Sequence, residues 1–128
     1  MAAIELDRLD HFVMPCGDVE AVAAFYVQAL DMEKVVFGKG RVALHFGRQK
    51  INLQPAGGYP GLHAPNHLAG TQDFCLISPT PLEQVKAELE ARGVELIEGP
   101  VPRSGAMGEM TSLYFRDPEG NLVEISNY

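Results

Sequence analysis

Tryptophan is missing from this sequence, cysteine occurs only twice, and acidic residues outnumber basic ones. Cys16 and Cys75 follow no metal-knuckle or disulfide-framework spacing, so we expect both to be reduced thiols. Ten Lys and Arg residues against seventeen Asp and Glu residues give a net charge of −7, which argues against nucleic acid or an anionic membrane as a partner. The expected partner is a small molecule.

Long hydrophobic runs are missing as well. The start, MAAIELDRLDHFV, has neither the basic region nor the apolar stretch of a signal peptide, and no segment approaches the ~20 apolar residues of a membrane span. We therefore expect a cytoplasmic protein. With 128 residues, 46% of them hydrophobic, the chain fits a single domain over residues 1–128 whose core needs no disulfide bonds.

The elements that are present follow one order twice. In the first half, a strand at 9–14 precedes a helix with Asp18 as its N-cap, and three extended segments follow at 34–37, 41–46 and 50–54. This half, about 8–55, is called module 1.

The second half begins again with a strand at 72–78. Thr80-Pro81-Leu82-Glu83 has the pattern of a capping box, which predicts a helix with Thr80 as its N-cap. Strands are expected at 94–97, 112–115 and 121–126, the last two joined by the turn sequence Asp117-Pro118-Glu119-Gly120. This half, about 71–127, is called module 2.

The chain thus has a βαβββ pattern in each module, and a linker at 56–70, rich in Gly and Pro, joins them. Neither module is long enough to bury its own sheet, so the two should pack together. The predicted fold class is α+β, with the two βαβββ modules forming a curved mixed sheet around a central cleft.

Superposing the two modules suggests a site. His11 in the first strand of module 1 matches Asp73 in module 2, and Asn52 in the last strand matches Glu124. Each is a polar residue between apolar ones, and side chains alternate faces along a strand, so the four are expected to point into one concave surface. An imidazole with one or two carboxylates is a common ligand set for a divalent metal.

The sequence resembles the vicinal-oxygen-chelate superfamily, which includes glyoxalase I, extradiol dioxygenases and bleomycin-binding proteins. The resemblance is carried by the repeated βαβββ pattern, the His in LDHFVM, the Phe25-Tyr26 pair and the terminal RDPEGNLVEI. Within that superfamily, HFGRQKINL and EGPVPRSGAMG are similar to a branch of glyoxalase-domain proteins that includes a virulence-associated bacterial protein.

The resemblance implies a metal site in which His11 and Glu124 match the family's first-strand histidine and last-strand glutamate. Asp73 stands where many members have a second histidine, and Asn52 where glyoxalase I has a second glutamate. The expected metal ligands are His11, Asp73 and Glu124, holding Mn, Fe, Ni, Zn or Mg. The oxygen-rich ligand set favours Mn²⁺, Fe²⁺ or Mg²⁺. His67 of the linker could replace Asp73, although both linker histidines, His63 and His67, are expected to be exposed.

Other residues are assigned by their place on the strands. Glu124 and Gln54 are the expected catalytic residues, because Glu124 could act as a base and Gln54 could orient a water or substrate. Asn52 and Arg103 are the expected substrate-binding residues, with Arg103 in a lid-like loop at 99–111. Cys75 shares a face with Asp73 and is expected to be a small buried hydrophobe rather than a nucleophile.

The leading functional prediction is a divalent-metal-dependent enzyme acting on a small oxygenated substrate. Its reaction would be glyoxalase-like, of the lactoylglutathione-lyase type, or like that of a ring-cleaving dioxygenase. The alternative is a metal-free protein that sequesters a ligand, as bleomycin-resistance proteins do. The resemblance also implies a homodimer.

Overall fold

The structure is a computed structural model that describes residues 3–128. Module 1 consists of β1 (His11–Cys16), α1 (Val19–Leu30), β2 (Glu33–Phe37), β3 (Arg41–Phe46) and β4 (Gln49–Pro55). Module 2 consists of β5 (Asp73–Ile77), α2 (Leu82–Ala91), β6 (Leu96–Gly105), β7 (Gly108–Arg116) and β8 (Leu122–Asn127). The predicted βαβββ order is therefore confirmed in both halves.

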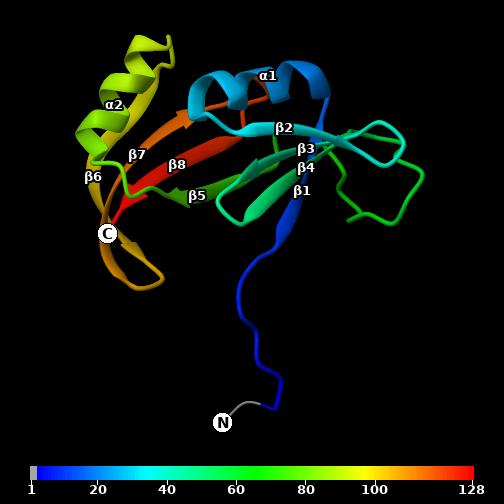
Figure 1. The fold of residues 1–128 in the computed structure, drawn as a ribbon, viewed down its shortest axis with the longest axis horizontal. Helices are drawn as coiled ribbons and strands as arrows, with labels where there is room; N and C mark the ends of the chain where they lie inside the picture. Colours follow the sequence, from blue (N-terminus) through cyan, green and yellow to red (C-terminus); the bar gives the residue numbers. More distant parts are fainter. Residues whose placement is uncertain (1–2) are drawn as a thin grey trace.

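Each module forms its own four-stranded mixed sheet, in the order β1-β4-β3-β2 and β5-β8-β7-β6. The first and last strands of each module, β1 with β4 and β5 with β8, are parallel, and the other pairs are antiparallel. One helix covers each sheet, and an extended amino-terminal arm leaves the body at the start of β1 (Figure 1). The α+β prediction holds, with two sheets in place of one continuous sheet.

Helix α1 has the N-cap and the buried apolar stripe that its sequence predicts. The Asp18 carboxylate accepts a 3.0 Å hydrogen bond from the amide of Ala21, which satisfies one free N–H group of the first turn. The apolar stripe faces the core, with Val22 and Tyr26 completely buried. The helix ends where Asp31 adopts a left-handed conformation, with φ of 57°.

Helix α2 begins differently from the prediction. Its N-cap is Pro81, and Thr80 makes no side-chain capping bond. The amide of Leu82 instead donates to Oδ1 of Asn127 at 2.7 Å, and the Asn127 amide group donates to the carbonyls of Ser78 and Thr80, each at 2.9 Å. The end of β8 therefore caps this helix in place of a local residue.

The prediction of a lid-like loop at 99–111 is also wrong. Residues 96–105 and 108–116 form β6 and β7, an antiparallel hairpin, and Arg103 lies in a strand opposite Met110. Gly99, Pro100 and Pro102 resemble loop residues in sequence, yet β6 is an edge strand, where missing amide donors are tolerated. Register shifts occur between Leu96 and Val101, next to these residues.

The two modules share one hydrophobic core. It combines residues from β1, α1, β3 and β4 with residues from α2, β7 and β8, and its fully buried members include Met14, Leu44, Ile51, Leu113, Phe115 and Val123. Aromatic contacts join the halves directly, since the rings of Phe12 and Phe74 are 5.1 Å apart and those of Phe25 and Phe115 are 6.1 Å apart. No helix within residues 3–128 is long and apolar enough to cross a membrane.

Candidate functional site

The strand pairings place the predicted site residues at equivalent positions in the two modules. Asn52 lies opposite Val13, and Glu124 lies opposite Cys75, in the two parallel strand pairs. His11 and Asp73 each lie two residues earlier, on the same face as Val13 and Cys75 respectively. The core-facing residues of these strands alternate with this polar set, so each module has one apolar face and one polar face.

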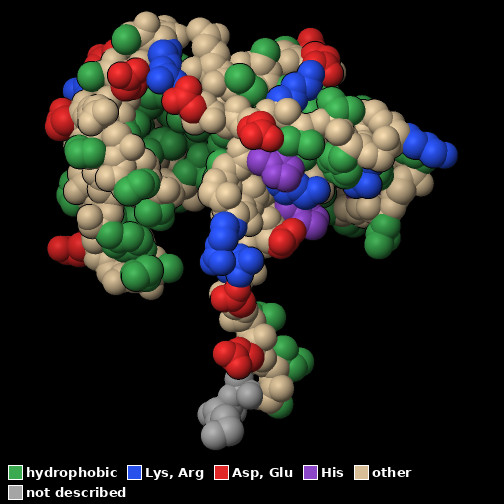
Figure 2. Space-filling view, viewed as in Figure 1, with side chains coloured by type: hydrophobic (Ala, Val, Ile, Leu, Met, Phe, Trp, Pro, Cys, Tyr) green, Lys and Arg blue, Asp and Glu red, His purple; other side chains and the backbone are tan. Residues whose placement is uncertain are grey.

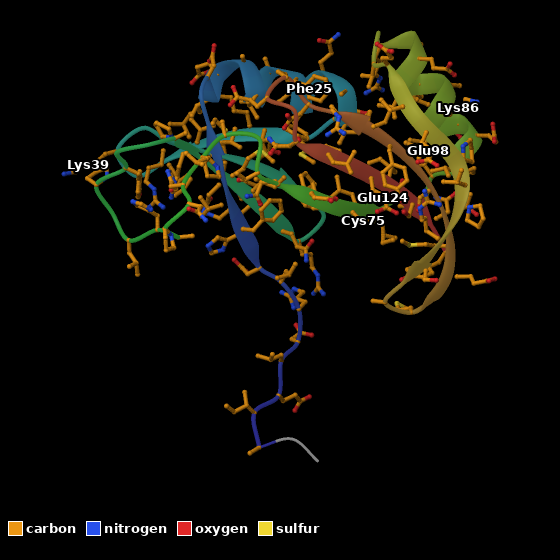
Figure 3. The ribbon with its side chains drawn as sticks, turned by 180° about the vertical axis from the view of Figure 1, so that it is seen from behind. Phe25, Lys39, Cys75, Lys86, Glu98 and Glu124 are labelled. Atoms are coloured by element: carbon orange, nitrogen blue, oxygen red, sulfur yellow. The ribbon has the colours of Figure 1, made fainter. Side chains whose placement is uncertain are left out.

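The polar face of module 2 is built around Glu124 on β8. Its carboxylate accepts a 3.3 Å hydrogen bond from the hydroxyl of Ser126, which is also 2.6 Å from the hydroxyl of the buried Ser112. The thiol of Cys75 lies 3.2 Å from the Ser126 hydroxyl. Glu124 and Cys75 sit side by side on adjacent strands, with Glu98 across from them on β6 (Figure 3). Hydroxyl groups thus hold a half-buried carboxylate in the centre of the sheet.

Arg103 and Tyr114 extend this face. The Arg103 Nε donates to the Tyr114 hydroxyl at 2.9 Å, and its terminal nitrogen lies 3.3 Å from the Glu98 carboxylate. Desolvation raises the pKa of Tyr114, Glu124 raises it further, and the hydrogen bond from Arg103 lowers it. Together with Asp73, these side chains line one open cavity of about 500 Å³. The structure therefore brings together Asp73, Glu124 and Arg103.

His11 lies elsewhere. It is exposed, its Nδ1 is 2.7 Å from the carboxylate of Asp10, and it lines a different opening with Lys50, Phe74 and Cys75. Among residues 3–128, no three His, Cys, Asp or Glu side chains are grouped closely enough to hold a metal ion. One copy of the chain therefore does not assemble the expected set of His11, Asp73 and Glu124.

Cys75 is exposed, whereas Cys16 is buried, and both are free. Desolvation raises the pKa of the Cys75 thiol, and the negative charge of Glu124 raises it as well, against a hydrogen bond from Ser126 that lowers it. The sequence predicted a buried side chain here, which is wrong for Cys75. A raised pKa keeps the thiol protonated, so Cys75 is a poor nucleophile.

The polar face of module 1 carries Asn52 and Gln54, both more than nine-tenths buried. The linker covers them, and His67 Nε2 is 2.8 Å from the Gln54 side-chain oxygen. His67 itself is only 6% exposed, which overturns the expectation of an exposed linker histidine. Its ring stacks on Tyr59, with the two centroids 6.0 Å apart.

Cationic side chains surround this second face. The guanidinium of Arg41 and the ammonium of Lys50 lie 4.6 Å and 4.2 Å from the centroid of the Phe37 ring. The sequence analysis did not single out Arg41 or Phe37. The period of two in RVALHF, which places Arg41 on the same face as Gln54, is the signal that could have found them.

Comparison with known proteins places this arrangement in context. The pattern of the Glyoxalase/Bleomycin resistance protein/Dioxygenase superfamily matches residues 8–125. The chain is 42% identical over 123 residues to virulence protein STM3117 of Salmonella typhimurium, covering 96% of this chain and 85% of that protein. It is also 42% identical to the glyoxalase domain-containing protein RDO1 of Mycosarcoma maydis, covering 98% of this chain and 70% of that protein.

Several solved structures have the same fold as this chain. An integron cassette protein from Vibrio cholerae is 44% identical, with a TM-score of 0.95 over 99% of both chains. A lactoylglutathione lyase from Agrobacterium tumefaciens is 24% identical, with a TM-score of 0.73 over 95% of this chain and 94% of that one. The antibiotic-binding protein TnmS3 from a Streptomyces species is 18% identical, with a TM-score of 0.75 over 97% and 98%. The last two likenesses concern the fold alone.

Proposed function

Because this chain belongs to the glyoxalase/bleomycin resistance protein/dioxygenase superfamily, we propose that it is a divalent-metal-dependent enzyme acting on a small oxygenated substrate. The reaction class is glyoxalase-like or like that of a ring-cleaving dioxygenase. The observation that carries this proposal is the setting of Glu124. The Glu124 carboxylate is half-buried, accepts a hydrogen bond from a serine hydroxyl and forms no ion pair with a described residue, although Arg103 and Arg116 line the same cavity, so it is available to a bound cation.

The metal site in this proposal is shared between two copies. Within one copy, His11 opens onto a different cavity from Asp73 and Glu124. We infer a homodimer in which module 1 of one copy faces module 2 of the other, so that His11 completes the pair of carboxylates. Charge is compatible with this arrangement, because Arg41 and Lys50 lie on the polar face of module 1, whereas three carboxylates and two arginines line the cavity of module 2 and leave it with one net negative charge.

The residues of this chain take distinct roles in the proposal. A bound divalent metal would supply Lewis-acid stabilisation of negative charge on two neighbouring substrate oxygens. Glu124 holds or moves a proton beside them. Arg103 binds an anionic group of the substrate, since a guanidinium forms paired hydrogen bonds with a carboxylate. Asn52 and Gln54 orient the substrate from module 1.

The test compares Glu124→Gln with Glu109→Gln, an exposed glutamate on β7 that serves as a matched control. Metal content is measured after incubation with Mn²⁺, Fe²⁺ or Zn²⁺, and turnover is measured with the methylglyoxal–glutathione hemithioacetal and with catechol. We expect Glu124→Gln to lose about a hundredfold in turnover, the usual scale for removing an acid–base group. Equal metal content and equal turnover in the two variants would overturn the proposal.

A metal-free binding protein is the second candidate. The separation of His11 from the two carboxylates within one copy favours it. If the protein is monomeric in solution and binds small oxygenated ligands equally well in the presence of EDTA, it is a binding protein and the proposed metal-dependent enzyme is ruled out.

A further inference from the structure

A pocket of about 410 Å³ lies on module 1, where the end of β4 meets the linker. It is lined by the side chains of Asn52 and Gln54, by two aromatic residues, Phe37 and Tyr59, and by Arg41. Its size is within the range of about 300–1,000 Å³ that is usual for small-molecule sites. It shares no lining residue with the cavity of module 2 that contains Glu124.

Two polar atoms beside this pocket have no hydrogen-bond partner among the described residues. They are Oδ1 of Asn52 and Nδ1 of His67, and both are completely buried. Leaving a buried polar atom without a partner is unfavourable, so the packing of module 1 alone does not explain why polar side chains stand here. Asn52 lines the pocket. Its Oδ1 is completely buried, so the atom that a ligand can reach is its amide nitrogen, which bonds to none of the described residues and can donate to a ligand hydroxyl oxygen.

His67 fixes the neighbouring amide. Its Nε2 pairs with the Gln54 oxygen at 2.8 Å, which leaves the amide nitrogen of Gln54 free to donate into the pocket. The stacking of the His67 ring on Tyr59 holds the linker in this position. Asn52 and Gln54 together present two N–H donors, which the two lone pairs of a single hydroxyl oxygen can accept.

The mouth of the pocket is positive although the protein carries a net charge of −7. Lys39 and Arg41 line it, and neither forms an ion pair with another described residue. The one acidic residue among the lining residues, Glu20, is paired with Lys34 at 2.6 Å. Lys39 projects at the end of the molecule away from Glu124 (Figure 3). Lys, Arg and His side chains also lie near the root of the amino-terminal arm in Figure 2, but acidic side chains lie among them there. Unpaired cations beside an aromatic pocket select an anionic ligand.

We propose that this pocket binds a small hydroxylated organic acid. The hydroxyl group of the ligand bonds to Asn52 and Gln54, its carboxylate pairs with Arg41, and its carbon skeleton packs against Phe37 and Tyr59. His67 is a positioning residue that orients Gln54. The inference rests on the proposed function in one respect, since it names the class of substrate that module 1 orients, and it assigns the substrate carboxylate to Arg41 in place of Arg103.

The test uses mandelate, and phenylacetate as a probe that lacks only the hydroxyl group, with affinities measured by calorimetric titration of the full chain. We expect mandelate to bind about tenfold more tightly, the scale of one buried hydrogen bond. Asn52→Leu and His67→Phe should remove this preference and leave phenylacetate binding unchanged. His63→Phe, which alters an exposed histidine of the same linker, should keep the preference.

Arg41→Gln should weaken both probes about tenfold, whereas Arg48→Gln, at an exposed turn, should weaken neither. Equal affinities of the two probes for the unaltered protein, or no binding of either, would overturn the inference. The Glu124→Gln variant separates it from the proposed function. With EDTA present to remove any metal, unchanged mandelate affinity in that variant supports a ligand site on module 1, and loss of mandelate binding assigns the ligand to module 2. Unchanged turnover in that variant would instead overturn the proposed function alone.

Discussion

The Tyr26 hydroxyl donates a 2.7 Å hydrogen bond to the Asp117 carboxylate, which joins helix α1 of module 1 to the turn between β7 and β8 of module 2. The same turn reaches back a second time, because the Glu119 carboxylate accepts hydrogen bonds from the amides of Gly17 and Asp18. Two of the sequence signatures of the family, Phe25-Tyr26 and RDPEGN, therefore meet each other. They hold the two modules together and take no direct part in the candidate site.

Tyr26→Phe should destabilise the protein by about 1–3 kcal/mol, because it removes a buried hydrogen bond to a charged group. Tyr26 is completely buried, and Asp117 is 5% exposed. Urea unfolding monitored by circular dichroism measures the free-energy difference. Tyr59→Phe is the control, since the Tyr59 hydroxyl bonds to none of the described residues. Equal changes in both variants would show that the hydrogen bond of the Tyr26 hydroxyl adds no more stability than an unbonded hydroxyl does.

Asn127→Ala should be more destabilising than Thr80→Ala, although the sequence points to Thr80 as the cap of α2. Asn127 satisfies the Leu82 amide and two carbonyls, and removal of an N-cap alone costs about 1 kcal/mol. We expect a loss of about 2 kcal/mol for Asn127→Ala and a few tenths for Thr80→Ala. Thermal unfolding of the two variants measures these losses. A larger loss for Thr80→Ala than for Asn127→Ala would show that Thr80 is the cap of α2, as the sequence predicts.

Stability should fall in alkaline solution because of Cys16. Burial, with the nearby charges of Glu119 and Asp117, raises the pKa of this thiol from 9.0 to about 12. Between these values the unfolded chain loses the proton while the folded protein keeps it, so stability is complete below pH 9 and declines above it. The decline from this group is at most about 1.4 kcal/mol per pH unit. In Cys16→Ala, unfolding free energies measured from pH 8 to pH 11 should decline less steeply, and identical slopes would contradict the assignment.

If the site is shared between two copies, two inactive variants should recover activity when they form a mixed dimer. Neither His11→Ala nor Glu124→Gln alone should be active, yet a dimer of the two variants contains one site with both residues intact. Equal co-expression should recover about a quarter of the normal activity, since half of the dimers are mixed and each has one good site of two. Turnover of co-purified protein measures this. No recovery from two inactive variants would mean that each site lies within one copy, and activity in either variant alone would mean that its residue is not used.

Local sequence was sufficient to predict most of the fold. The stripe of Val22 and Tyr26, the Asp18 cap and the turn at Asp117–Gly120 each depend on neighbouring residues, and each is present in the structure. The equivalence of Asn52 and Glu124 was also predictable, since a duplicated strand pattern fixes which face each residue occupies.

What sequence could not predict depends on distant partners. Asn127 takes over the capping of α2 from a different element, and β7 pairs with the Gly- and Pro-containing segment that sequence marks as a loop. His67 is buried because the linker folds over β4, a contact that no periodicity encodes. The placement of His11 away from Glu124 is of the same kind, since it depends on how two sheets pack.

The contact between Tyr26 and Asp117 spans 91 residues, which has a consequence for the newly made polypeptide. While the ribosome is still translating the second half, the first helix has no partner for its tyrosine and leaves part of its apolar stripe uncovered. Completion of the amino-terminal half must then wait until the β7–β8 hairpin has been made, so the two halves mature as one cooperative unit.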